Sequence, residues 1–199
     1  MHTFRKLRDN IDPAPYLLEI DAIDGVWQEQ TGRQDAGTVQ REVLSIPLRG
    51  MVRSAQGNRP RRDVHESRWT SGSARFPRFR EFLNQVAADE DALLGRAKIV
   101  CLPAGRRVLP HTDRGEYYRL RNRYHLVLRS SLGSWLKAGD EEVRMQAGEL
   151  WWFDNKAVHE AHNDGTEDRI HLIFDMLPSR LERDVSRASR KAKAASVAR

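Results

Sequence analysis

The chain has 199 residues, of which 39% are hydrophobic and 31% are charged, with a formal net charge of +6. The length predicts one domain with a sizeable core, and the composition excludes an intrinsically disordered chain. No apolar run approaches the roughly 20 residues of a membrane-spanning helix, and we expect no secretory signal. Cys101 is the only cysteine, so an intramolecular disulfide is excluded and we expect a reducing, cytoplasmic setting.

The positive charge is concentrated at the end of the sequence. Residues 179–199 hold seven basic residues and two acidic ones, a net charge of +5, whereas the rest of the chain is close to neutral. We therefore expect residues 1–178 to form the domain and residues 179–199 to be a basic tail that is helical or disordered. Nucleic acid is not favoured as a partner, because the body of the protein carries almost no excess charge.

The first half of the sequence contains segments of mixed type. Tyr16–Trp27 follows two prolines and predicts a short helix or turn, and Val43–Leu48 has the β-branched, apolar character of a strand. Arg49–Ser73 is rich in Gly, Arg, Ser and Pro and predicts a long, mobile loop. Phe76–Ala88 carries apolar residues at helical spacing and predicts a helix.

From about residue 95 to residue 177, short strand-like segments alternate with turns. The eight segments are Lys98–Leu102, Arg107–His111, Tyr124–Arg129, Ser134–Lys137, Glu142–Met145, Leu150–Phe153, Val158–Asn163 and Arg169–Phe174. This spacing is typical of a small antiparallel barrel or jelly roll. We therefore expect a mainly β fold whose core lies at about 95–177, with N-terminal helices covering one outer face.

The motif Leu109-Pro110-His111-Thr112-Asp113 places an imidazole and a carboxylate two residues apart. Residues i and i+2 of a strand project to the same face, so both side chains can reach one ion. His159, 48 residues later, supplies a third ligand. Two histidines and one carboxylate leave positions open for a chelating co-substrate and O₂, whereas a structural zinc site would need four closed ligands.

Arg169 lies at a position that suits an anionic co-substrate. It is ten positions beyond His159, at the start of the next expected strand, and its planar guanidinium can hold a carboxylate by two hydrogen bonds. Arg123 and His125 are two residues apart on another expected strand and therefore share a face. The residues alone leave open that this is a solvated basic pair on the rim of the barrel.

The segment from Leu94 to Leu177 resembles the aspartyl/asparaginyl β-hydroxylase family. The motifs that carry the resemblance are LPHTD (109–113), RYHLVL (123–128), GELWWFDN (148–155), HEAHN (159–163) and RIHLIFD (169–175). The resemblance implies a double-stranded β-helix, the cupin-like form of the jelly roll, and an Fe(II)- and 2-oxoglutarate-dependent dioxygenase. It implies that His111 and His159 bind the iron.

The same resemblance assigns roles to the remaining candidates. Arg169 would hold the distal carboxylate of 2-oxoglutarate, with Arg123 and His125 near its other end. Asp113 is a departure from the vertebrate members, which lack the carboxylate ligand, and a complete triad favours hydroxylation over halogenation. Asp113 also makes the chain similar to the small bacterial members, some of which act on free amino acids.

Several other residues of these motifs have a simpler interpretation. His162 and His171 are expected to be hydrogen-bonded structural residues, and Asp175 to make a structural hydrogen bond. Trp151 and Trp152 are expected to pack in the core or at a strand edge, and Asp154 and Asn155 to shape a turn. The Cys101 thiol is expected to be a small buried hydrophobe.

Two alternatives stay open at the level of sequence. A cupin-type metalloenzyme without 2-oxoglutarate could share the triad, but it would not need Arg169. The second alternative is a barrel that binds a small ligand and catalyses no reaction. For an oxygenase, the arginine-rich segment Arg53–Arg75 is the candidate for substrate recognition, and its charge suits an acidic substrate, either an amino acid or a residue in a peptide.

Overall fold

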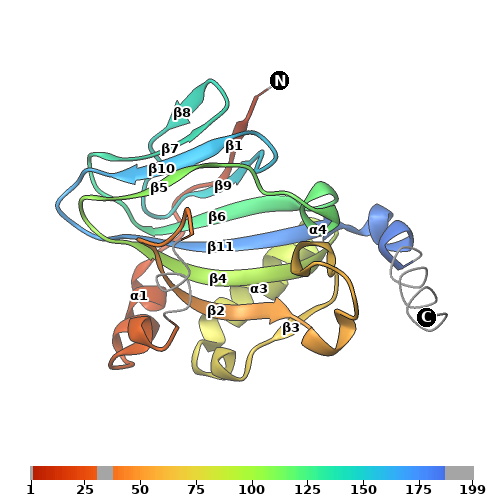
Figure 1. Cartoon of the computed structure of the whole chain (residues 1–199). Coiled ribbons are helices and arrows are strands. Elements are labelled where there is room, and N and C mark those ends of the chain that lie inside the picture. The colour runs from red at the N-terminus through yellow and green to blue at the C-terminus, as the bar shows by residue number, and fades with distance from the viewer. Residues whose placement is uncertain (1, 31–37, 187–199) are drawn as a thin grey trace.

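Two antiparallel β-sheets form the framework of the protein (Figure 1). The computed structural model describes residues 2–30 and 38–186. The larger sheet has the order β1-β9-β6-β11-β4-β2-β3, formed by Phe4–Arg8, Leu150–Phe153, Asn122–Arg129, Arg169–Pro178, Ala92–Leu102, Leu44–Met51 and Ser67–Trp69. The smaller sheet has the order β5-β10-β7-β8, formed by Arg106–His111, His159–Asn163, Ser134–Ala138 and Glu141–Val143. The arrangement is a double-stranded β-helix, as predicted.

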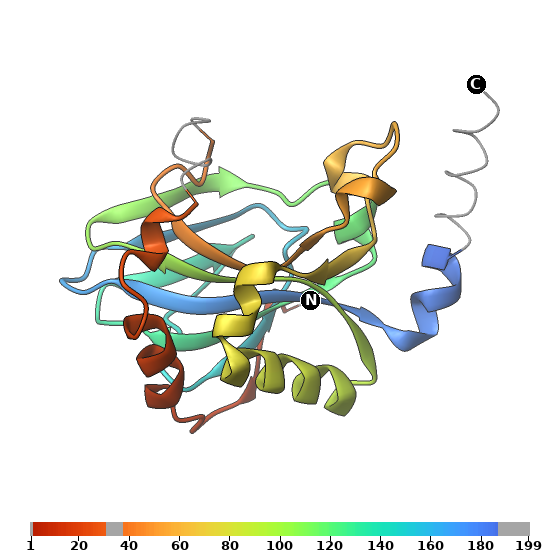
Figure 2. The ribbon, with the colours of Figure 1, turned by 90° about the horizontal axis from the view of Figure 1, so that it is seen from below.

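Two helices cover the outer face of the larger sheet, α1 (Ala14–Asp21) and α3 (Pro77–Asp89) (Figure 2). The apolar residues Phe79, Leu83 and Val86 recur at helical spacing on α3 and are buried against the sheet. Proline stands at the start of both helices, where its missing N–H costs nothing. The predicted helix and its position on one outer face are confirmed.

Strand alternation divides the larger sheet into two faces with different chemistry. On β11, Leu172, Phe174 and Met176 point toward the helices and are fully buried in the outer core. The alternate residues of the same strand, including Arg169 and Asp175, occupy the opposite face, toward the smaller sheet. The space between the sheets holds a second, smaller apolar core. Ionisable groups on this inner face are therefore enclosed by protein, which is the setting of the candidate site.

The eight predicted strands all occur, and the bounds of seven of them differ from the prediction by four residues or fewer. The eighth, β4, begins at Ala92, six residues earlier than predicted. The larger differences are N-terminal. The segment expected as one long loop, Arg49–Ser73, continues β2 to Met51, forms 3₁₀ turns at Arg53–Ala55 and Arg61–Asp63, and forms β3, so that prediction was wrong in part. Strand β1 was not predicted, and it pairs with β9 at the edge of the sheet.

The expected helix or turn at Tyr16–Trp27 corresponds to α1 and a 3₁₀ turn at Val26–Gln28. Within the part of the chain that the structure describes, no helix is long and apolar enough to cross a membrane. The last strand is followed by a 3₁₀ turn, Ser179–Leu181. Most of the expected basic tail, residues 187–199, lies outside the described residues.

Candidate active site

The two histidines of the predicted triad come from paired strands. His111 is the last residue of β5 and His159 is the first residue of β10, and the two lie directly opposite each other in the antiparallel pair. Asp113 follows β5 by two residues. One ligand atom from each of the three side chains lies within 4.8 Å of the other two. The fold therefore brings the three predicted ligands to one point.

Hydrogen bonds to the backbone orient both imidazoles. Nδ1 of His111 lies 2.8 Å from the carbonyl oxygen of Leu109, and Nδ1 of His159 lies 3.0 Å from that of Ala157. A carbonyl oxygen can only accept, so each Nδ1 carries a proton, and Nε2 is the nitrogen of each ring that is placed to bind a metal ion. Burial lowers the pKa of His159 to about 4, so this ring is neutral near pH 7. His159 therefore has the form that binds a metal ion through Nε2.

The carboxylate of Asp113 is held by two donors. Its Oδ2 accepts hydrogen bonds from Nη1 of Arg123 and from Nδ2 of Asn155, the latter at 3.1 Å. Burial opposes ionisation of Asp113, but Arg123, His159 and Asn155 together outweigh it, so its pKa lies below the usual value. Asn155 was expected only to shape a turn, and the structure adds this contact with a candidate ligand.

Arg123 lies between two carboxylates beneath the triad. Its Nε donates to Oδ1 of Asp175 at 2.8 Å and its Nη2 to Oδ2 at 3.2 Å, while Nη1 reaches Asp113. All three side chains are almost completely enclosed, and the two acids balance the desolvation of the cation. The structural hydrogen bond expected of Asp175 is confirmed. Arg123 also lines the cavity beside the triad, where the sequence placed it near the co-substrate.

Arg169 faces the same cavity from the first position of β11. Its side chain is buried, and within the described ranges we find no hydrogen bond or ion pair for its guanidinium. Burial alone lowers its pKa to about 10, which agrees with the lack of a nearby carboxylate. A buried cation without an anionic partner is costly, so this position is suited to an anion that is brought by a ligand.

Apolar side chains enclose the space between Arg169 and the triad. They are Val43, Val100, Leu102, Val108, Leu136, Phe153, Ala161 and Ile173. His125 is the polar group beside them, and its Nδ1 lies 3.2 Å from Nδ1 of His171. Burial lowers the pKa of both rings well below the usual value, so both are neutral. His171 thus has the hydrogen-bonded role expected of it, whereas His162 stacks on Trp135, away from the triad.

Two residues near the site were not predicted. The side-chain nitrogen of Gln40 lies 3.3 Å from Nε2 of His111, and nothing in its polar surroundings distinguishes it in the sequence. Lys98 lines the cavity from β4. A signal for Lys98 did exist, because it occupies the inner-face position of a strand whose neighbours are apolar.

Residues 52–178, more than half of the chain, match the sequence model of a family described as Aspartyl/Asparaginyl beta-hydroxylase. The chain belongs to the aspartyl/asparaginyl β-hydroxylase family. The resemblance drawn from its motifs is therefore confirmed. This member of the family is 36% identical over 72 residues to L-proline cis-3-hydroxylase 1 of a Streptomyces species. That match covers 35% of the chain and spans about a quarter of the relative's length.

Solved structures of hydroxylases share the architecture of this family member. A prolyl hydroxylase from Trichoplax adhaerens, in complex with a hypoxia inducible factor peptide fragment, matches with a TM-score of 0.58 and 11% identity. The match covers 90% of this chain and 87% of that one. A viral collagen prolyl hydroxylase from Paramecium Bursaria Chlorella virus-1 matches with a TM-score of 0.50 and 10% identity, covering 88% and 96%. At these identities the likeness is one of fold alone.

Proposed function

We propose that the chain is an Fe(II)- and 2-oxoglutarate-dependent dioxygenase that hydroxylates an unactivated C–H bond of an amino acid or of an amino-acid residue in a peptide. One observation carries this proposal. The two histidines that cluster with Asp113 and a buried arginine without an anionic partner among the described residues line one cavity. The first feature suits a metal ion with open positions, and the second suits the free end of a dicarboxylate.

The donor set fits Fe(II). His111 and His159 would bind through Nε2, and Asp113 would bind through a carboxylate oxygen. An Fe(II) ion held there, with 2-oxoglutarate and O₂, supplies the chemistry that adds one oxygen atom to the substrate and yields succinate and CO₂. The complete triad supports hydroxylation over halogenation, because Asp113 occupies the position that a halide would need.

The protein's own residues bind and enclose the co-substrate. Arg169 would hold the distal carboxylate of 2-oxoglutarate, because its guanidinium can donate two hydrogen bonds to one carboxylate. The apolar walls of the cavity exclude water around this ion pair and so strengthen it. His125 and Arg123 line the part of the cavity nearer the triad. Arg123 acts there mainly through its hydrogen bond to Asp113, which fixes the orientation of the carboxylate ligand.

The names of the relatives support the substrate class. One relative is named for the hydroxylation of L-proline, and a structural neighbour is a prolyl hydroxylase bound to a peptide fragment. A free amino acid and a residue in a peptide are therefore both candidate substrates. The buried thiol of Cys101, which is not in a disulfide, fits a reducing compartment, and we propose the cytoplasm as the setting.

A turnover screen tests the proposal. The protein is loaded with Fe(II) and supplied with 2-oxoglutarate and O₂, and each free amino acid and a set of short peptides is added separately. Succinate release measures co-substrate turnover, and mass spectrometry detects a gain of one oxygen atom in the added compound. A substrate that gains oxygen with matching succinate release is the expected result. Metal binding without any succinate release would instead favour a cupin-type enzyme that does not use 2-oxoglutarate.

A further inference from the structure

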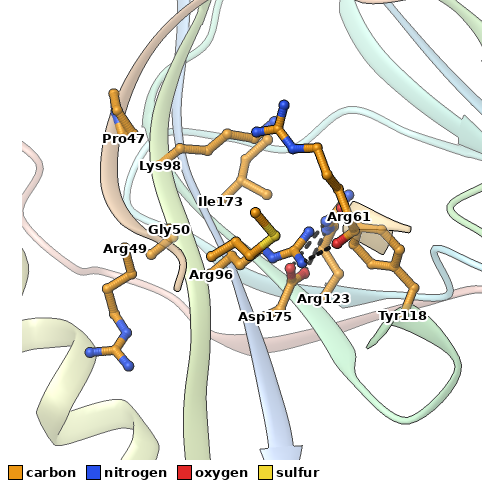
Figure 3. Close-up of a pocket in the computed structure, with 12 residues that line it drawn as sticks. Pro47, Arg49, Gly50, Arg61, Arg96, Lys98, Tyr118, Arg123, Ile173 and Asp175 are labelled. Atoms are coloured by element: carbon orange, nitrogen blue, oxygen red, sulfur yellow. Dashed lines mark hydrogen bonds and ion pairs between the residues drawn. The ribbon is translucent and has the colours of Figure 1, made fainter. Parts of the chain in front are cut away.

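A second cavity adjoins the cavity beside the triad, which we call the metal cavity. Its volume is about 270 Å³. It shares the lining residues Lys98, Arg123 and Ile173 with the metal cavity, so the two cavities are neighbours. Figure 3 shows the residues that line the second cavity. A molecule bound there would lie next to Arg123, which contacts Asp113 of the triad. We call this second cavity the outer pocket.

The outer pocket has one carboxylate among its lining residues, Asp175, against five cationic side chains: Arg49, Arg61, Arg96, Lys98 and Arg123. Both oxygens of Asp175 accept hydrogen bonds from Arg123, so this carboxylate already has a cationic partner. The pocket therefore has a marked excess of positive charge. The contacts of the individual cations decide which of them can reach a ligand.

Two of the cations have structural roles. The guanidinium of Arg49 donates to the carbonyl oxygen of Gly95 at 2.9 Å and packs over the Trp69 ring at 4.8 Å, and in Figure 3 it points away from the pocket. Nη2 of Arg96 donates to the carbonyl oxygens of Arg61 and Val64, at 2.8 and 2.9 Å. These bonds occupy Nε of Arg49 and Nη2 of Arg96, whereas Nε of Arg96 is buried without a hydrogen-bond partner among the described residues.

Arg61 differs from these two arginines, and Lys98 lies opposite it. Their side chains extend toward each other across the pocket from the 3₁₀ turn at Arg61–Asp63 and from β4 (Figure 3). Within the described part of the chain, the guanidinium of Arg61 has no hydrogen bond or ion pair. The turn that carries it is fixed in place, because Arg96 holds the Arg61 carbonyl and the Asp63 carboxylate accepts a hydrogen bond from the backbone of Glu116. Two positively charged side chains therefore converge on the pocket, and the turn that carries Arg61 is held in place by hydrogen bonds.

We propose that the outer pocket binds a carboxylate of the substrate through Arg61 and Lys98, and so places the reactive C–H bond toward the triad. This inference rests on the proposed function, since it assigns the substrate of the same site. A carboxylate can come from the α-carboxylate of a free amino acid or from the side chain of an acidic residue in a peptide. Both sources provide the same chemistry, two acceptor oxygens for a guanidinium and an ammonium.

Paired probes distinguish the two sources. L-proline and L-prolinamide differ in the α-carboxylate, and an acetylated, amidated Ala-Asp-Ala peptide differs from its Ala-Asn-Ala counterpart in the side-chain carboxylate. Binding of each probe to the protein loaded with Fe(II) and 2-oxoglutarate is measured by calorimetry without O₂. The wild type is compared with Arg61→Glu, Arg61→Lys and Arg68→Glu. Arg68 is exposed and does not line the outer pocket. Arg68→Glu is therefore a control that makes the same change of charge outside the pocket.

We expect one carboxylate probe to bind more tightly than its carboxamide partner, and the pair that shows this preference identifies the source. Arg61→Glu should weaken binding of that probe by about 10- to 100-fold, the loss expected for a hydrogen bond to a charged group. Arg61→Lys should retain part of the affinity, and Arg68→Glu should match the wild type. The proposal is overturned if the wild type binds neither carboxylate probe more tightly than its carboxamide partner. It is also overturned if the Arg61→Glu variant still prefers the carboxylate probe to the same extent. Binding without O₂ does not depend on turnover, so a failure of the proposed function would appear separately as absent succinate release.

Discussion

Arg123 and Asp175 form a buried ion pair with two hydrogen bonds, and the remaining terminal nitrogen of the same guanidinium contacts Asp113. The pair joins adjacent strands, because Arg123 and Asp175 lie opposite each other in the register of β6 and β11. Strand pairing therefore fixes the guanidinium, and the guanidinium fixes the carboxylate ligand. The pairing of β6 and β11 therefore orients Asp113, the candidate carboxylate ligand, through Arg123.

Substitution of Asp175 by Asn should weaken metal binding although residue 175 is not a ligand. An amide retains the shape of the carboxylate but loses the charge that holds Arg123, so the orientation of Asp113 is less well defined. Loss of a group that orients a metal ligand typically costs about 10- to 100-fold in metal affinity. Titration of the metal-free protein with Fe(II) without O₂ measures this change.

Asp89→Asn is the matched control, because it breaks the exposed ion pair between Asp89 and Arg8, far from the triad. We expect its metal affinity to equal that of the wild type. A thermal melt establishes that the Asp175→Asn protein is folded, and Arg123→Lys provides a second variant of the same contact. Unchanged metal affinity in both folded variants would show that the ion pair does not position Asp113.

Gly115 should tolerate alanine poorly because of both its backbone and its surroundings. Its φ is +110°, and an added Cβ would lie 2.6 Å from the carbonyl oxygen of Arg62. Gly57→Ala is the comparison, since φ there is +54° and nothing lies within 4 Å of the added Cβ. The left-handed backbone alone costs about 1–2 kcal/mol, so the free energy of unfolding should fall by more than this for Gly115→Ala. Equal losses in denaturant titrations of the two variants would argue against the steric contact.

Acidification should destabilise the metal-free protein through His65. Burial, and then the nearby charge of Arg121, lower the pKa of His65 to about 4 from an ordinary 6.5. The unfolded state therefore binds more protons than the folded state between these values. The stabilising effect of a neutral His65 is complete above pH 6.5 and is lost as the pH falls toward 4.

The thermal midpoint of the wild type should fall over this pH range, and His65→Gln should flatten part of the fall. The residual slope comes from the other buried histidines, whose pKa values are also lowered. Melts are recorded with a chelator present, so that protonation of metal ligands does not change metal occupancy during the series. A slope for His65→Gln that is the same as the wild-type slope would contradict the prediction.

Arg169→Lys should raise the KM for 2-oxoglutarate with a smaller effect on metal affinity. Lysine keeps the charge but cannot form two parallel hydrogen bonds with one carboxylate. Loss of one charge-assisted hydrogen bond corresponds to about 10- to 100-fold in affinity. Calorimetric titration of the Fe(II)-loaded protein with 2-oxoglutarate, without O₂, gives the affinity directly. An unchanged value would place the distal carboxylate elsewhere.

Local patterns in the sequence predicted the candidate metal ligands, which the fold brings together, and the strands near them. His111 and Asp113 are two residues apart, and strand alternation predicted that they would reach the same point. In the structure β5 ends at His111, and Asp113 reaches that point from the segment just after the strand. The distance of ten residues between His159 and Arg169 fits a strand, a turn and a returning strand. Such short-range relations depend on backbone geometry, which is nearly the same in every strand.

Contacts between residues distant in the sequence could not be predicted in the same way. Gln40 meets His111 across 71 positions, and Asp175 meets Arg123 across 52, with no local pattern that joins either pair. Strand β1 has mixed charged and apolar residues because it lies at the edge of the sheet, so it lacked a clear strand signal. Tertiary packing determines these positions.

Succinate formation from 2-oxoglutarate is the direct measure of whether the triad and Arg169 form an oxygenase site. Wild-type protein, His111→Ala and Arg169→Ala, each shown to be folded by its thermal melt, are supplied with Fe(II), 2-oxoglutarate and O₂. We predict that the wild type forms succinate and that both variants lose most of this activity, His111→Ala through loss of metal and Arg169→Ala through loss of co-substrate binding. Folded variants that turn over 2-oxoglutarate like the wild type would show that His111 and Arg169 do not bind the metal ion and the co-substrate.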